Sequence, residues 1–319
     1  MLKPLRHQRR HKHDRRRQRD QDRPLRPPVS DASDPRRVLA AHGLRAKKTW
    51  GQNFLVDPSV NREIAVATEA GPDHPVVELG AGTGALTRAL LERGATVIAV
   101  ERDRDLVPIL RRELASFSRL QILEADAARL DYQHLALRLG GPLIIAGNLP
   151  YQLSGRILVG IADAHDQVCR AVIMVQREVA ERVSAPPNSR TYGLLSVLVQ
   201  RAFGAEILRE VGPEAFVPSP RVHSAVVRLM PHGLSFAAER DRHLVHAARA
   251  AFSSRRKTIK NSLSGALKVG PQTIETALIA AGINPMTRAE TLSVSDFARL
   301  GDALSARDLL SAPLPVDPT

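Results

Sequence analysis

The sequence of 319 residues has little cysteine and no long apolar run. Its one cysteine, Cys169, excludes an internal disulfide and a zinc site built from several cysteines, and it favours a reducing, cytoplasmic location. The longest segment without Asp, Glu, Lys or Arg spans residues 139–155, and its glycines and prolines are wrong for a membrane-spanning helix. We therefore expect a cytoplasmic protein with no membrane segment.

Acidic residues are scarce at the N-terminus. Residues 1–28 hold 11 Lys and Arg against 3 Asp, so this short segment carries most of the chain's net charge of +13. Residues 1–35 lack apolar periodicity, which predicts a disordered basic arm. A polyanion partner and a solvated tail both fit such an arm. No apolar core of a secretory signal is present, and the three Asp disfavour a mitochondrial presequence.

Between about residues 58 and 176, short β-branched runs alternate with helical patterns, which predicts βαβ units. Asp57 and Pro58 are expected to cap and open a helix that ends near Ala70. Such continuous apolar runs suit a parallel sheet covered by helices on both faces. The strands are expected at residues 75–79, 95–101, 120–124, 143–147 and 170–176.

Two further strands are predicted at residues 205–211 and 222–230. Their connection is too short for a crossover helix, so they should form an antiparallel hairpin at the sheet edge. From about Ala237 the pattern is helical throughout, which predicts a smaller helical domain. The chain thus divides into an arm (1–35), an α/β domain (36–235), a helical domain (236–306) and a disordered tail (307–319).

A glycine-rich turn beginning at Gly80 follows the first predicted strand. Glycines let the backbone turn tightly and approach a nucleotide closely, although the same turn fits a dinucleotide site or a plain strand-to-helix connection. Glu101, Asp126 and Asn148 follow at intervals of one βα repeat each. These residues should therefore line up at the carboxyl edge of one sheet, where ligands of such folds bind.

The segment Asn148-Leu149-Pro150-Tyr151 matches the (Asn/Asp)-Pro-Pro-(Tyr/Phe) pattern of amino-group methyltransferases, with Leu in the second place. An adenine amine is a poor nucleophile because its lone pair is delocalised into the ring. If the Asn148 side-chain oxygen and the Leu149 carbonyl accept its two N–H bonds, they aim the lone pair at a methyl donor and stabilise the developing positive charge. Pro150 fixes the backbone, and Tyr151 offers a ring to a base removed from its stack. A turn with a packed tyrosine is the simpler alternative.

Seven segments together resemble the small-subunit ribosomal RNA adenine dimethyltransferase family, over about residues 44–304. They are KKTWGQNFLVD (47–57), VVELGAGTGALT (76–87), NLPY (148–151), VQREVAERV (175–183), FVPSPRVHSAVVRL (216–229), AFSSRRKTIKNSL (251–263) and RAETLSVSDFARL (288–300). QNFL and NLPY are specific for the wider superfamily, whereas the motifs of the helical domain point to the small-subunit branch. Ala81, where proline is usual, and Trp50 are mild departures.

The resemblance implies a class I S-adenosylmethionine-dependent methyltransferase fold: a Rossmann-like α/β domain with a mostly parallel seven-stranded sheet, followed by a small C-terminal all-helical domain that contacts RNA. It further implies dimethylation of N6 on two adjacent adenines in the 3′-terminal hairpin loop of 16S rRNA, within the small ribosomal subunit, during its biogenesis. No metal is implied, and we expect a monomer.

By position, the resemblance also implies the site residues. Contacts to S-adenosylmethionine fall on Gln52, Asn53, Leu55, Gly80, Gly82, Glu101, Asp126 and Asn148. In this interpretation Glu101 binds the ribose hydroxyls of the donor, and Asp126 binds its adenine amine. Phe216 would supply a second aromatic wall opposite Tyr151, with a hydrophobic hairpin tip as the alternative.

A cationic segment opens one predicted helix of the helical domain. It comprises Arg255, Arg256, Lys257 and Lys260, and no acidic residue interrupts it. Contact with RNA phosphates is the functional interpretation, and a solvated helix face is the ordinary one.

Three alternative functions stay open. A large-subunit rRNA adenine N6-dimethylase of the antibiotic-resistance type is disfavoured by NLPY together with the segment RRKTIKNSL. A non-catalytic ribosome assembly or transcription factor on the same fold is disfavoured by the intact Gly80, Glu101 and Asn148. A nicotinamide dehydrogenase is disfavoured by NLPY.

Overall fold

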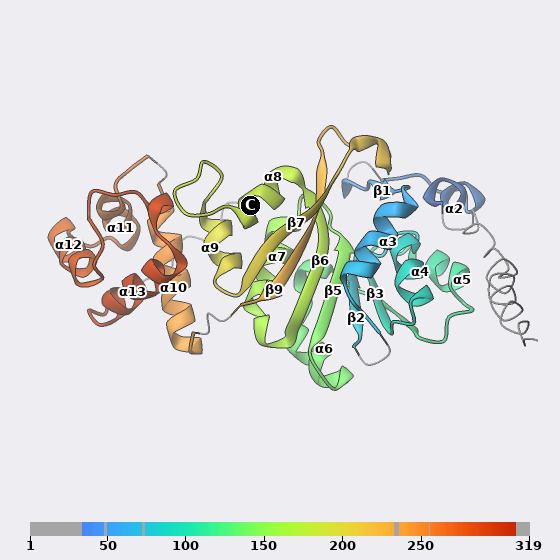
Figure 1. Cartoon of the computed structure of the whole chain (residues 1–319), viewed down its shortest axis with the longest axis horizontal. Helices are drawn as coiled ribbons and strands as arrows, with labels where there is room; N and C mark the ends of the chain where they lie inside the picture. The colour runs from blue at the N-terminus through green and yellow to red at the C-terminus, as the bar shows by residue number, and fades with distance from the viewer. Residues whose placement is uncertain (1–33, 48–49, 72–73, 233–235, 255, 311–319) are drawn as a thin grey trace, which may run out of the picture.

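The computed structural model describes residues 34–47, 50–71, 74–232, 236–254 and 256–310 (Figure 1). Among these residues, seven strands form one sheet in the order β4-β3-β2-β5-β6-β9-β7. The strands are β2 (Val76–Leu79), β3 (Val97–Glu101), β4 (Leu120–Glu124), β5 (Leu143–Asn148), β6 (Val168–Gln176), β7 (Phe203–Val211) and β9 (Ser224–Pro231). The first five are parallel, and β9 runs antiparallel to β6 and β7. The predicted α/β fold with a mostly parallel sheet is confirmed.

Helices cover both faces of this sheet. One face carries α3 (Pro58–Ala67), α4 (Ala85–Glu92) and α5 (Val107–Glu113), and the other carries α6 (Tyr132–Leu139), α7 (Ser154–Asp163), α8 (Arg177–Ser184) and α9 (Leu194–Gln200). Successive strand residues point to opposite faces, so Val76 packs in the first layer and Val77 in the second. The central strands β2, β3 and β5 are buried on both sides, which explains their continuous apolar runs.

The five strands predicted before the hairpin are confirmed, and each begins and ends within two residues of its predicted bounds. Asp57 caps α3 by accepting a hydrogen bond from the Ser59 N–H at 2.8 Å, and Pro58 occupies the first turn, although the helix ends at Ala67 rather than at Ala70. The antiparallel hairpin is also confirmed, with β7 at the sheet edge. Its connection contains a strand that the sequence did not predict, β8 (Phe216–Val217), which pairs with β1 (Phe54–Leu55).

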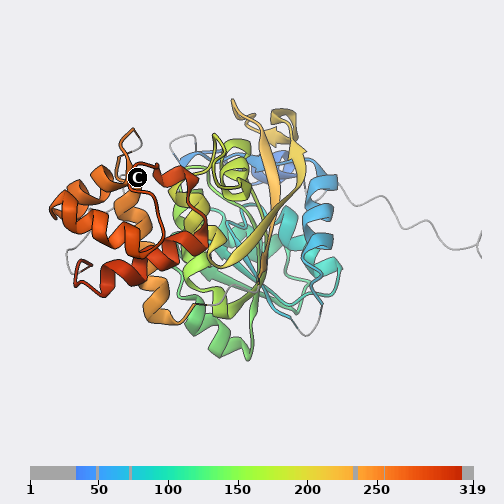
Figure 2. The same ribbon diagram turned by 60° about the vertical axis from the view of Figure 1, so that its left-hand side comes forward.

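The C-terminal helices gather at the end of the molecule opposite α2 (Pro35–Ala41) (Figures 1 and 2). They are α10 (Ala238–Ala251), α11 (Ile259–Leu267), α12 (Pro271–Ala280) and α13 (Val294–Ser305). Their apolar faces enclose a core of their own that contains Leu244, Ile274 and Phe297. The Tyr192 hydroxyl, in the segment before α9, donates to the Leu292 carbonyl at 2.9 Å and ties this core to the α/β domain.

The two predicted disordered ends are each too long by a few residues. Asp34 caps α2, and Pro35 is buried as its first residue, so the arm cannot extend to residue 35. Leu309 and Leu310 pack against the helical core, which contradicts a disordered tail from residue 307. Residues 1–33 and 311–319 lie outside the described residues. No helix within the described ranges is long and apolar enough to cross a membrane.

Candidate active site

A cavity of about 370 Å³ lies at the carboxyl ends of the central parallel strands. This volume is within the range of small-molecule sites. Its lining includes every predicted donor contact: Gln52, Asn53, Leu55, Gly80, Gly82, Glu101, Asp126 and Asn148. Leu149, Pro150 and Tyr151 line it as well. The topology therefore brings together residues that are spread over a hundred positions of the sequence.

The glycine-rich turn after β2 holds Glu101 in place. Gly82 has φ +58°, which favours glycine, and a Cβ there would lie 3.3 Å from the Phe54 ring, which would have to shift slightly. Its N–H donates to Glu101 Oε2 at 2.8 Å, and the Asp103 N–H donates to Oε1 at 2.8 Å. Burial raises the pKa of Glu101 even though these N–H groups oppose the shift. Each carboxyl oxygen keeps a further lone pair for a ligand hydroxyl.

Asn148 ends β5 with its carboxamide oriented by a second element. The side-chain Nδ2 donates to the Asn53 carbonyl at 3.2 Å, which leaves the side-chain oxygen available as an acceptor. The Leu149 N–H donates to the Met174 carbonyl at 3.0 Å, and the Leu149 side chain is buried. The backbone of this turn is thus anchored to β6 while its polar groups border the cavity.

Tyr151 is held by a serine that sequence reasoning missed. Its hydroxyl lies 2.7 Å from Ser224 Oγ, and Ser224 is fully buried at the start of β9. Burial raises the pKa of the Tyr151 phenol, so the ring remains neutral near pH 7. The Ser154 hydroxyl also donates to the Tyr151 carbonyl at 3.0 Å. The distant Ser224 therefore holds the ring predicted to receive a flipped base, and the neighbouring Ser154 holds the Tyr151 backbone.

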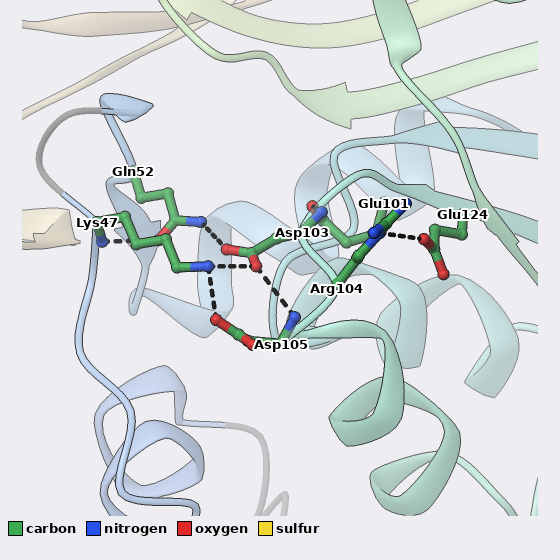
Figure 3. Close-up of polar contacts among 7 residues, drawn as sticks. All are labelled: Lys47, Gln52, Glu101, Asp103, Arg104, Asp105 and Glu124. Carbon is green, nitrogen blue, oxygen red and sulfur yellow. Dashed lines mark hydrogen bonds and ion pairs between the residues drawn. The ribbon is translucent and has the colours of Figure 1, made fainter.

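A network around Asp103 pins the segment that precedes β1 (Figure 3). Lys47 Nζ donates to Asp103 Oδ1 at 2.5 Å and to Asp105 at 2.7 Å, and Gln52 Nε2 donates to Asp103 Oδ2 at 2.7 Å. Burial alone would raise the pKa of Asp103, but the hydrogen bonds from Lys47 and Gln52 outweigh it and lower the pKa. Sequence reasoning missed Asp103 because its two partners lie more than fifty residues earlier.

The structure does not bring Phe216 to the cavity, so its role as a second aromatic wall stays a prediction. The side chain is 2% exposed and belongs to the core beneath α3 and α4, and it does not line the cavity. The reason is the unpredicted strand β8, which pairs Phe216 with Leu55 and turns the ring into the core.

Glu78 is a buried carboxyl at the cavity to which sequence reasoning gave no role. It is 1% exposed, and its Oε2 has no hydrogen-bond partner among the described residues. Burial raises its pKa to about 8, and the nearby carboxyl of Glu101 adds to this effect. Glu78 is therefore mostly protonated at neutral pH. The sequence feature that could have indicated a role for Glu78 is its place in the VVELGAG segment, directly before the glycine-rich turn.

Comparison with known proteins identifies the family of this chain. The model of the family described as "Ribosomal RNA adenine dimethylase" matches residues 43–305. The chain belongs to this family. It is accordingly an S-adenosylmethionine-dependent rRNA adenine dimethyltransferase with the class I methyltransferase fold.

Relatives and solved structures agree with this assignment. The "Ribosomal RNA small subunit methyltransferase A" of Anaeromyxobacter dehalogenans (strain 2CP-C) is 47% identical over 278 residues, which cover 85% of this chain and 97% of that protein. The protein of the same name from Myxococcus xanthus is 42% identical over 85% of this chain and 95% of its own. The structure of the 23S rRNA methyltransferase ErmE has a TM-score of 0.59 at 26% identity and covers 79% of this chain and 99% of its own. A dimethyladenosine transferase from Plasmodium falciparum, at a TM-score of 0.64, 24% identity and 80% and 98% coverage, shows the same fold.

The predicted RNA contacts of this dimethyltransferase lie in the helical domain and do not line the cavity. Arg256 and Lys257 are exposed directly before α11, and Lys260 lies in its first turn with Nζ 3.1 Å from Glu275. Arg255 lies outside the described residues. Within the described ranges, no group of three or more His, Cys, Asp or Glu side chains could hold a metal ion.

Proposed function

We propose that this dimethyltransferase modifies N6 of two adjacent adenines in the 3′-terminal hairpin loop of 16S rRNA during biogenesis of the small ribosomal subunit. The curated relatives named small subunit methyltransferase A support this choice of substrate. The observation that carries the chemistry is the Asn148 carboxamide, whose nitrogen is bound to the Asn53 carbonyl and whose oxygen remains available at the cavity.

The residues of the cavity fit S-adenosylmethionine, which supplies a methyl group on an activated sulfonium. Glu101 offers two acceptor oxygens to the ribose hydroxyls from a carboxyl fixed by two backbone N–H groups. Asp126 accepts the Ala128 N–H through Oδ1 at 3.0 Å, which leaves Oδ2 for the adenine amine of the donor. The glycine turn at Gly80 and Gly82 removes side chains from the path of the ligand.

Asn148 and Leu149 activate the target amine in this proposal. Their carbonyl oxygens accept the two N–H bonds of the adenine N6, so the nitrogen lone pair is released from the ring and directed at the methyl group. Both oxygens interact more strongly as positive charge develops on nitrogen, which lowers the barrier. No strong general base is required because the methylated, protonated arylamine is acidic enough to lose its proton to water.

The cationic segment before and within α11 supports RNA binding. Cations near a helix N-terminus are unfavourably placed against the helix dipole. Arg256, Lys257 and Lys260 therefore gain when an RNA phosphate lies against them, and we include Arg255 in the same contact. The proposal also takes the enzyme to act as a monomer. It places the enzyme in the cytoplasm, a reducing compartment that the single cysteine favours.

Methylation of purified, unmodified small ribosomal subunits and, in a parallel reaction, of large subunits with labelled S-adenosylmethionine, followed by mapping of the modified bases, tests the proposal. The expected result is two methyl groups on each of two adjacent adenines in the 3′-terminal hairpin. Label on a large-subunit adenine would instead support the antibiotic-resistance type. No transfer to any rRNA would support a non-catalytic assembly role.

A further inference from the structure

Trp50 lies at the rim of the cavity and has no part in the function proposed above. It is the only tryptophan of the chain, and its side chain is 39% exposed. Two cations face its ring: the guanidinium carbon of Arg102 is 4.5 Å and the ammonium of Lys47 is 4.9 Å from the ring centroid. Both distances are within the range of cation–π attraction. The indole is thus held in place while part of its surface faces the cavity.

The neighbours of Arg102 show at which end of the cavity the Trp50 ring lies. It directly follows Glu101, the acceptor for the ribose hydroxyls, and its Nη1 lies 3.9 Å from Asp126 Oδ2, the acceptor for the adenine amine. The indole therefore borders the part of the cavity that would take the adenosine, and the turn of Asn148 lies after a different strand.

Charge around the ring distinguishes the two planar ligands that could reach it, the adenine of the donor and a base of the RNA. The Lys47 ammonium is bound by Asp103 and Asp105 at 2.5 and 2.7 Å, and Arg102 faces Asp126. Three carboxylates thus outnumber the two cations. A polyanion gains little from cations that are neutralised in this way, and the excess of carboxylates opposes it. The uncharged adenine of the donor meets no such opposition.

We propose that Trp50 is a binding residue for the methyl donor and that its indole stacks on the adenine ring. Lys47 and Arg102 position the indole for this contact. The inference rests on the proposed function because it takes S-adenosylmethionine as the ligand, and it adds a donor contact that neither the glycine turn nor the acidic residues provide.

Tryptophan fluorescence tests the contact directly, since the whole signal comes from Trp50. Titration of the full chain with S-adenosylhomocysteine, the unreactive product, should quench this fluorescence and saturate at the Kd that calorimetry gives for the same ligand. Titration with an RNA copy of the 3′-terminal hairpin should leave the signal largely unchanged.

Variants measure how much the contact contributes. Trp50→Ala should weaken S-adenosylhomocysteine binding on the order of tenfold, as expected for one lost aromatic stacking surface. Trp50→Phe should retain most of the affinity, and both variants should bind the hairpin RNA like the wild type. Leu137→Ala is the matched control, because Leu137 is an exposed apolar residue on α6 outside the cavity. Glu101→Ala should lose donor affinity independently of Trp50.

The outcomes separate the two proposals. Wild-type affinity of Trp50→Ala for S-adenosylhomocysteine would overturn the inference, as would quenching by the RNA instead of by the donor product. If the wild-type chain itself does not bind S-adenosylhomocysteine, the proposed function fails and takes the inference with it. If the wild type and the Trp50 variants bind S-adenosylhomocysteine with the same affinity, only the inference about Trp50 is contradicted.

Discussion

Glu78 shows how the fold imposes an unusual protonation state on one residue. The carboxyl is fully enclosed at the end of β2, beside the carboxyl of Glu101, and its Oε2 lacks a hydrogen-bond partner among the described residues. Ionisation would leave an unpaired charge away from water, so the folded protein retains the proton up to a pKa of about 8. The unfolded chain loses it near the ordinary glutamate pKa of 4.5.

The stability of the protein should therefore depend on pH through this residue. Below about pH 4.5 both states hold the proton. Between about 4.5 and 8 only the folded state holds it, so the contribution of Glu78 to stability falls by up to about 1.4 kcal/mol per pH unit. Glu78→Gln mimics the protonated acid and should become progressively more stable than the wild type over this window. Urea unfolding of both proteins across pH 4–9 checks this.

Exposed Glu92 on α4 provides the control for this series. Glu92→Gln should leave the pH dependence of unfolding close to that of the wild type. If the free energy of unfolding of Glu78→Gln differs from that of the wild type by the same amount at every pH, Glu78 is not protonated in the folded protein as proposed.

The orientation of the Tyr151 ring depends on one hydroxyl, that of Ser224. Ser224 is buried and its hydroxyl has the Tyr151 phenol at 2.7 Å. The bond joins the Asn148 turn to the start of β9, an element far away in the sequence. We interpret Ser224 as a positioning residue, because it acts on the target base only through the tyrosine ring.

Ser224→Ala should impair capture of the target adenine while donor binding stays intact. The loss of one neutral hydrogen bond is worth about 0.5–1.5 kcal/mol, whereas Tyr151→Ala should cost about 1–3 kcal/mol for a lost stacking surface. Single-turnover methylation at increasing RNA concentrations measures both. Combining Ser224→Ala with Tyr151→Phe should add nothing to either single change; fully additive losses would show that Ser224 does not act through the tyrosine hydroxyl.

At the scale of elements, the close pairing of β2 and β5 brings the glycine turn and Asn148 together at the cavity. The two strands are parallel neighbours, and the glycine turn and Asn148 extend from their carboxyl ends. Gly147 lies next to Asn148, and a Cβ at this position would stand 2.4 Å from the Leu79 carbonyl oxygen. Only glycine allows the two backbones to approach this closely at the edge of the cavity.

Gly147→Ala should therefore destabilise the fold by about 1–3 kcal/mol, as in other overpacked sites, and it should displace Asn148. Gly265→Ala is the control: it lies exposed within α11 with no atom close to the added methyl, and it should stabilise the protein by about 0.5–1 kcal/mol. Thermal unfolding distinguishes the two variants. A Gly147→Ala protein as stable as the wild type would contradict the required close approach.

The sequence predicts the centre of the sheet well because β2, β3 and β5 are buried on both faces and appear in the sequence as continuous apolar runs. Strand β8 escapes prediction because two residues carry no periodicity, and its stability comes from pairing with β1. The same limitation explains Phe216, whose motif placed it at the site but whose burial depends on that pairing. The predicted arm includes Pro35, the first residue of helix α2, because the basic tract before it carries no periodicity that marks where the helix begins.

The candidate site was predictable where residues follow strand ends in a fixed topology, as for Gly80, Glu101 and Asn148. Residues that act through contacts between distant segments were not predictable. Asp103 requires Lys47 and Gln52, and Trp50 requires Arg102, and each pairing exists only after folding. A local pattern cannot report such partners.

At the scale of the whole molecule, positive charge is unevenly distributed along the sequence. The N-terminal 28 residues hold 11 of the 46 Lys and Arg, and the cationic residues at α11 belong to the helical domain. Around the cavity, by contrast, Lys47 and Arg102 face carboxylates. Electrostatic RNA binding and methyl transfer should therefore be separable.

Removal of residues 1–28 should leave methyl transfer largely intact and flatten the salt dependence of RNA binding. Each phosphate contact that is lost reduces the slope of log K against log salt by about 0.9 or less. RNA binding over a salt series, with single-turnover rates at saturating RNA, measures both effects. Loss of activity with an unchanged slope would show that the arm has a structural role instead.

The central claim is that the Asn148 carboxamide accelerates methyl transfer to an adenine N6 within the cavity. Because its oxygen interacts most strongly with the nitrogen as positive charge grows, its loss should act on the transition state rather than on binding. The most direct test is the single-turnover rate of Asn148→Ala with saturating RNA and donor. A folded variant with near-normal RNA affinity and a rate lowered roughly 10²–10³-fold is predicted, by analogy with the loss of one preorganised oxyanion-hole donor. A rate close to that of the wild type would contradict the account.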